Sequence, residues 1–169
     1  TNSVSGPGLL AILTVSGGIT GTGNLILNNN NSTLTNGIQL ITTAVNNTGT
    51  IINSGTGTSG TLISAVIGSN VTGVTQNSAT SALTLSSANL NFGAATVSAG
   101  TLSITGSSAA APAITSLSVA AGATFNTLNT VGQTLSLTSL NLGAGTGTTT
   151  LGMELGSISS YDNLSLTGA

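Results

Sequence analysis

Short alternation of apolar and polar residues dominates this chain. Short segments read apolar–polar–apolar with a period of two. That period predicts β-strands with one buried face, and we count roughly sixteen of them. Glycine, asparagine and serine separate the segments and predict turns, for example at Asn36-Gly37 and Thr48-Gly49. The clearest predicted strands lie within 23–28, 81–87, 101–106, 116–122, 134–143 and 163–168.

The predicted strands resemble one another. VSAGTL (97–102) reappears as VAAGATF (119–125), so that Gly122 occupies the place of Gly100. A leucine–serine–apolar core also recurs along the chain. It occurs at Leu102-Ser103-Ile104, Leu117-Ser118-Val119, Leu135-Ser136-Leu137 and Leu164-Ser165-Leu166. Units of about 19–22 residues with short strands predict one solenoid domain over positions 1–169, a right-handed parallel β-helix of about 6–8 coils.

The geometry of a parallel β-helix suits these residues. Successive coils stack about 4.8 Å apart, so residues at equivalent positions form ladders. Leucine, isoleucine and valine would fill the inner ladders, and threonine, serine and asparagine would line the outer ones without charge repulsion. A β-sandwich is the alternative, because it also uses short alternating strands. Sandwiches usually carry aromatic cores, whereas the aromatic residues here are only Phe92, Phe125 and Tyr161.

Composition excludes several classes of function. Lysine, arginine, histidine and cysteine are absent, and threonine, serine and asparagine make up 73 of the 169 residues. Most enzyme chemistry, histidine or cysteine metal sites, and electrostatic binding to nucleic acid or anionic lipid are therefore not expected. We predict a protein that is not an enzyme and has no cofactor. The mean hydropathy of +0.47 predicts a folded chain rather than a disordered one.

Glu154 and Asp162 are the only carboxylates, and they lie close together in the sequence. They are weak candidates for half of a calcium site or for an acid/base pair, and solvated turn carboxylates are the favoured interpretation. The run Asn28 to Asn31 is an internal ladder or a polar turn. The turn is favoured, because four adjacent asparagines cannot all face inward.

Residues 81–169 resemble a known family. The segment SALTLSSANLNFGAATVSAGTLSITG (81–106), with Val97-Ser98-Ala99-Gly100-Thr101-Leu102 at its centre, resembles the autotransporter-associated β-strand repeat of bacterial surface proteins. Residues 1–80 match that repeat only in composition. The resemblance implies a parallel β-helix, export, and an extracellular or cell-surface location in bacteria. It implies no catalytic residue and no single ligand.

The functional hypothesis rests on the two ends of the predicted solenoid, where strand edges are unpaired. An unpaired strand edge invites pairing unless lysine, proline, a bulge or a cap protects it, and the chain has no lysine. Leu9 to Val15 is too short for a membrane span, so it is not expected to insert into a membrane. The expected assembly edges are Leu9, Leu10, Ile12, Leu13, Val15, Leu164 and Leu166.

We therefore expect a structural protein that forms or extends an extracellular fibre, stalk or surface layer by end-to-end stacking. Its partners would be copies of itself, head to tail, or the flanking coils of a longer chain. The alternative is an adhesin or an ice-binding module that uses a flat Thr/Ser/Asn face, with a cell-surface polysaccharide as a further candidate partner. Thr-Gly-Thr occurs at 20–22, 48–50, 56–58 and 146–148, and this spacing does not predict one regular array.

Overall fold

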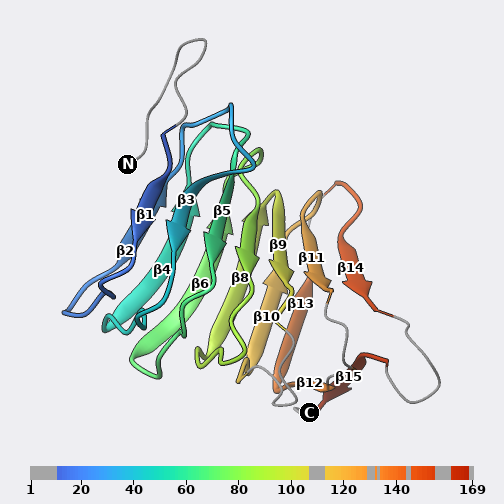
Figure 1. The fold of residues 1–169 in the computed structure, drawn as a ribbon. Coiled ribbons are helices and arrows are strands. Elements are labelled where there is room, and N and C mark those ends of the chain that lie inside the picture. The colour runs from blue at the N-terminus through green and yellow to red at the C-terminus, as the bar shows by residue number, and fades with distance from the viewer. Residues whose placement is uncertain are drawn as a thin grey trace.

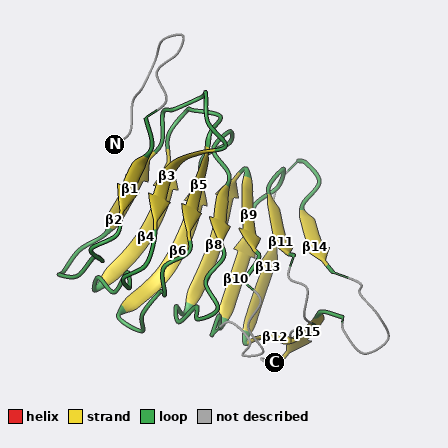
Figure 2. Ribbon diagram, in the orientation of Figure 1, coloured by secondary structure: helices red, strands yellow, loops and turns green. Residues whose placement is uncertain are grey.

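The chain folds as a parallel β-solenoid. The structure, a computed structural model, describes residues 11–106, 113–128, 132, 134–143, 146–154 and 161–167. Within these residues there are fifteen strands and no helix, and every strand pairing is parallel (Figures 1 and 2). The prediction of a parallel β-helix is thus confirmed. The antiparallel β-sandwich is wrong for this chain.

The first sheet forms one side of the solenoid and contains seven strands in chain order. Its strands are β1 (Leu13–Val15), β3 (Asn36–Leu40), β5 (Gly60–Ile63), β7 (Leu83–Leu85), β9 (Thr101–Ile104), β11 (Thr124–Thr127) and β14 (Thr150–Met153).

The second sheet faces the first, and its strands alternate with those of the first along the chain (Figure 1). Its strands are β2 (Leu25–Asn28), β4 (Gly49–Ser54), β6 (Val71–Asn77), β8 (Ala94–Ala99), β10 (Ser116–Val119) and β13 (Ser139–Leu142). A first-sheet strand and the next second-sheet strand define one coil, so β1 to β13 make six coils and β14 begins another.

A third side closes each coil. Near the C-terminus it is a short sheet of β12 (Thr134–Leu137) and β15 (Asn163–Leu166). In the first four coils it consists of isolated parallel bridges, which join Ile19, Val45, Ile67 and Leu90 in sequence and Thr22 to Thr48.

Coil length varies more than the sequence repeats predict. The coil that leads from Leu83 to its partner Leu102 is clearly shorter than the coil that leads from Phe125 to its partner Leu151. The corners between strands absorb the difference. The repeat at Gly100 and Gly122 does mark one full coil, because Val97 pairs with Val119 one coil further on.

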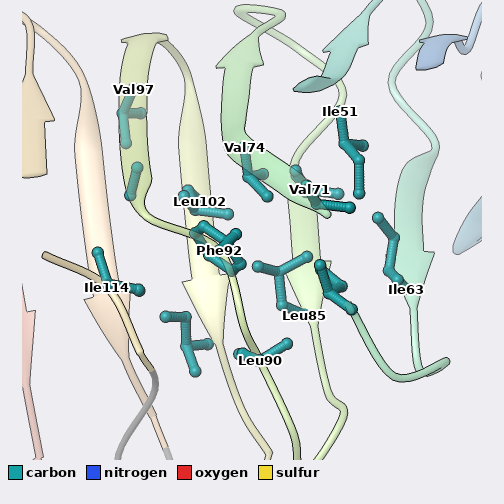
Figure 3. Close-up of a cluster of buried hydrophobic side chains, with 14 of the residues drawn as sticks. Ile51, Ile63, Val71, Val74, Leu85, Leu90, Phe92, Val97, Leu102 and Ile114 are labelled. Carbon is teal, nitrogen blue, oxygen red and sulfur yellow. The ribbon is translucent and has the colours of Figure 1, made fainter. Parts of the chain in front are cut away.

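Inward side chains form mainly apolar columns. One column of the first sheet runs through Ile38, Thr61, Leu83, Leu102 and Phe125, which are register partners and are all fully buried. Figure 3 shows such side chains from both sheets pointing into the space between them, among them Ile51, Leu85 and Val97. Burial of these columns supplies the main favourable free energy of the fold.

Outward side chains form the expected ladders of small polar groups. Thr84, Ser103 and Asn126 are successive partners on the first sheet. Thr75, Thr96, Ser118 and Asn141 are successive partners on the second sheet. Because these residues are uncharged, stacking them one per coil creates no repulsion.

Two local expectations are corrected. Asn36-Gly37, predicted as a turn, begins β3, where the register against β5 shifts between Asn36 and Ile38. Thr48-Gly49, also predicted as a turn, leads directly into β4, whose first residue is Gly49. Phe92 and Phe125 are two of the largest fully buried side chains.

Candidate functional site

Large apolar side chains reach solvent mainly at the two ends of the solenoid. The most exposed ones in the first coil are Ile12, Leu13 and Ile26, the last with 59% of its surface exposed. The others lie in the last coils, at Leu128, Leu142, Tyr161 and Leu166. Among the described residues between 36 and 119, no large hydrophobic side chain is exposed to this degree. The apolar surface is therefore concentrated where coil stacking stops.

Open strand edges accompany this apolar surface. Among the described residues, β1 pairs only with β3 and β2 only with β4 at one end. At the other end, β14, β13 and β15 each have a single partner strand. A strand with one partner leaves a row of backbone groups that can pair with another chain.

The structure places most of the predicted edge residues at these ends. Ile12 and Leu13 are exposed beside or within β1, and Leu166 is exposed in β15. Val15 and Leu164 are half-buried and pack against the core. Leu9 and Leu10 lie outside the described residues.

Within the described residues, the interior columns also end on aliphatic side chains. At the first coil they present Val15 and Leu25, which are half-buried. At the last coil they present Leu142, 46% exposed, together with the half-buried Leu151 and Met153. Stacking another coil on either end would bury apolar surface and strand edges together.

Glu154 and Asp162 lie close together, but the contact joins the Asp162 carboxylate to the Glu154 backbone, and the expectation of a solvated turn carboxylate is wrong for Asp162. Asp162 is buried, and its Oδ2 accepts hydrogen bonds from Thr127 Oγ1 (2.6 Å) and from the backbone N–H of Glu154 (3.1 Å). The backbone N–H of Asp162 also donates to the carbonyl of Glu154 (3.0 Å). Asp162 therefore joins the last coil to β11. Among the described residues, no three histidine, cysteine, aspartate or glutamate side chains gather as metal ligands.

Sequence reasoning missed a buried group of polar residues, which we call the polar corner. It lies where the chain turns from the second sheet back to the first, over the first four coils. Its members are Asn29, Asn31, Asn53, Ser59, Thr61, Gln76, Ser78 and Ser81, all buried. The expected polar turn at Asn28 to Asn31 is thus only half correct, because alternate asparagines face inward.

The polar corner is extensively hydrogen-bonded. Asn29 Nδ2 donates to the carbonyl oxygens of Ser59 (2.8 Å) and Gly60 (2.9 Å). Asn31 Oδ1 accepts from Ser59 Oγ (2.8 Å), and Ser81 Oγ donates to the Ser59 carbonyl (2.8 Å). These contacts join residues that are far apart in the chain and belong to different coils. The sequence could not reveal them without knowledge of which coils are neighbours.

The comparisons with known proteins return no matching family model, no similar curated protein and no similar solved structure. In the part of the chain that the structure describes, no helix is long and apolar enough to cross a membrane.

Proposed function

We propose that this chain is a structural, non-catalytic, exported β-solenoid that forms or extends an extracellular fibre, stalk or surface layer by end-to-end stacking. The observation that carries the proposal is the gathering of exposed large apolar residues, such as Leu13 and Leu142, at solenoid ends that also have open strand edges. The partner is a second copy, head to tail, or the flanking coils of a longer chain.

Charge favours this mode of assembly. The net charge is −2, and the chain contains no lysine or arginine. Electrostatic repulsion between copies is therefore small at any salt concentration. A head-to-tail contact joins two different ends of the solenoid. Unless the rotation from one copy to the next closes a ring, such a contact generates an open filament.

Export and the bacterial cell surface follow from the sequence resemblance. Val97 to Leu102 matches the core of the autotransporter-associated β-strand repeat, and Val97 pairs with Val119, its counterpart in the repeated segment, one coil later. The absence of cysteine makes the fold independent of the redox state of the compartment.

Negative-stain microscopy with light scattering on the purified chain tests the proposal. We expect thin unbranched filaments whose number rises with protein concentration. Leu13→Lys and Leu142→Lys, which place a charge on an open end, should shorten or abolish them. Leu62→Lys, on the outward face of β5 in the middle of the solenoid, is the matched control and should leave filaments intact. A stable monodisperse monomer at high concentration would contradict stacking.

A face of stacked polar residues supports a second candidate, an adhesin or ice-binding module. Thr101, Thr124 and Thr150 are successive partners on the outward side of the first sheet, beside the ladder of Thr84, Ser103 and Asn126. Such a face offers hydroxyl and amide groups at regular spacing to a polysaccharide or to ice. If this face binds polysaccharide, the chain should cosediment with insoluble cell-surface polysaccharide, and Thr124→Tyr should abolish this. If the face binds ice, the chain should inhibit ice growth, and the same substitution should abolish that inhibition.

A further inference from the structure

Strand register is irregular in only one part of the solenoid. Among the described pairings, shifts occur between Asn36 and Ile38, between Gly49 and Thr50, and between Gln76 and Asn77. All three involve strands β3 to β8. The pairings from β9 onward run without a shift. Alternation of apolar and polar residues alone therefore does not define the register in the first half of the chain.

The same strands carry buried amides in an interior column. Asn53 of β4 and Gln76 of β6 are register partners, between Leu27 on one side and Val97 on the other. Asn53 Nδ2 donates to Gln76 Oε1 (2.7 Å) and to the carbonyl of Ser81 (2.8 Å). Gln76 Nε2 donates to the carbonyls of Ser78 (2.7 Å) and Ser81 (2.9 Å).

We propose that the Asn53–Gln76 pair is a register lock that fixes how β4 aligns on β6. A shift of two positions would keep the inward and outward faces, so burial alone opposes it weakly. It would, however, place Val74 opposite Asn53, or Ile51 opposite Gln76. The Asn53 Nδ2 donor would then lose the Gln76 Oε1 acceptor, and an unsatisfied buried donor is costly.

The second half of the chain provides the contrast. In β10 and β13 the inward positions are Leu117, Val119, Leu140 and Leu142. A shift of two positions there exchanges one aliphatic neighbour for another and strands no polar group. Inward-facing amides therefore occur where bulges disturb the register, and the inward positions of these two regular strands carry none.

Disulfide trapping tests the lock, because the chain contains no cysteine of its own. Ile52 and Thr75 are register partners, so the pair I52C/T75C reports the native alignment. Ile52 and Asn77 are diagonal neighbours about 7–8 Å apart, near or beyond the reach of a disulfide. The pair I52C/N77C therefore reports the shift that places Ile51 opposite Gln76.

In a glutathione redox buffer, we expect the otherwise unsubstituted chain to form the I52C/T75C disulfide and little of the I52C/N77C disulfide. Adding Asn53→Leu and Gln76→Leu together should raise the I52C/N77C disulfide by about tenfold, the factor that corresponds to roughly one net hydrogen bond. Val97→Ala, in the same column, is the control, because it loosens packing without removing an amide.

Two outcomes would overturn the lock. One is an unchanged level of the I52C/N77C disulfide in the double leucine variant. The other is an equal rise in Val97→Ala, which would attribute the shift to general loosening. If circular dichroism shows that the double variant does not fold, Gln76→Met alone replaces it, and the same reporter should move in the same direction.

Discussion

Gly100 lies directly against the carbonyl oxygen of Ser78, one coil earlier, and a Cβ at Gly100 would overlap that oxygen. Its φ of 69° is in the left-handed region that side chains other than glycine rarely adopt. The same carbonyl accepts the hydrogen bond from Gln76 Nε2. Glycine at position 100 therefore allows the turn between β8 and β9 to approach Ser78 of the polar corner closely.

Gly100→Ala should lower the free energy of unfolding by about 3 kcal/mol, because backbone strain and a clash with Ser78 act together. Gly122 is the matched control. It has a φ of 80° and follows the corresponding strand one coil later, but no atom lies within 4 Å of its Cβ position. Gly122→Ala should cost only the strain, about 1–2 kcal/mol. Urea denaturation of the two variants measures the difference, and equal losses would contradict the close approach.

The apolar members of the inward column of the first sheet should dominate stability. Leu102 is fully buried between its partners Leu83 and Phe125. Leu102→Ala should cost about 2–5 kcal/mol, through lost burial and the cavity left behind. Thr84→Ala, on the outward side of the neighbouring strand β7, should change stability by no more than about 0.5 kcal/mol. Thermal denaturation followed by circular dichroism compares them.

Asp162 and Glu154 should contribute unequally to the free energy of unfolding. Asp162→Ala removes the acceptor of two hydrogen bonds, from Thr127 Oγ1 and the Glu154 N–H, and should cost about 1–3 kcal/mol. Glu154→Ala keeps that backbone donor and should be nearly neutral. Asp162→Asn retains an acceptor oxygen and should fall between them. If Glu154→Ala lowers the free energy of unfolding more than Asp162→Ala does, the structural role assigned to Asp162 is contradicted.

Gln76→Glu should make stability depend on pH. The introduced carboxyl would face the carbonyls of Ser78 and Ser81, in a chain with no lysine, arginine or histidine to compensate a charge. Burial raises the pKa of such a carboxyl above its unfolded value of about 4.3, so the folded state binds the proton more tightly. Stability should therefore be highest below that value and fall as pH rises through the folded pKa.

The control for that variant is Gln39→Glu, at a half-buried outward position of β3. Its stability should change little with pH. Urea denaturation at about pH 4 and about pH 7 separates the two variants. A Gln76→Glu protein equally stable at both values would show that Gln76 is not in a closed polar site.

The strands and one repeat were predictable from the sequence, and the assignment of strands to sides was not. Val97 to Leu102 and 119–125 occupy equivalent places one coil apart, as their spacing predicts. The leucine–serine–apolar units, however, occupy different sides, since Leu102 lies in β9, Leu117 in β10 and Leu135 in β12. Period-two alternation marks a buried face but carries no information about which side of a coil a strand occupies.

The inward polar residues show a second limit of the sequence. Asn53 and Thr61 stand at positions where the alternation predicts an aliphatic side chain, and both are fully buried. Their burial is favourable only because hydrogen-bonding partners come from neighbouring coils, as Gln76 does for Asn53. Sequence alone does not identify those neighbours, because coil length is not constant along the solenoid.

End-to-end stacking is tested most directly by the mass per unit length of filaments formed by this chain, measured by scanning transmission electron microscopy. Six to seven coils at about 4.8 Å give each 16.1 kDa chain a rise of about 30 Å. Stacking of intact solenoids therefore predicts about 0.5 kDa per Å for a single filament. A cross-β fibril with one chain per layer of about 4.8 Å would give about 3 kDa per Å and would contradict the account.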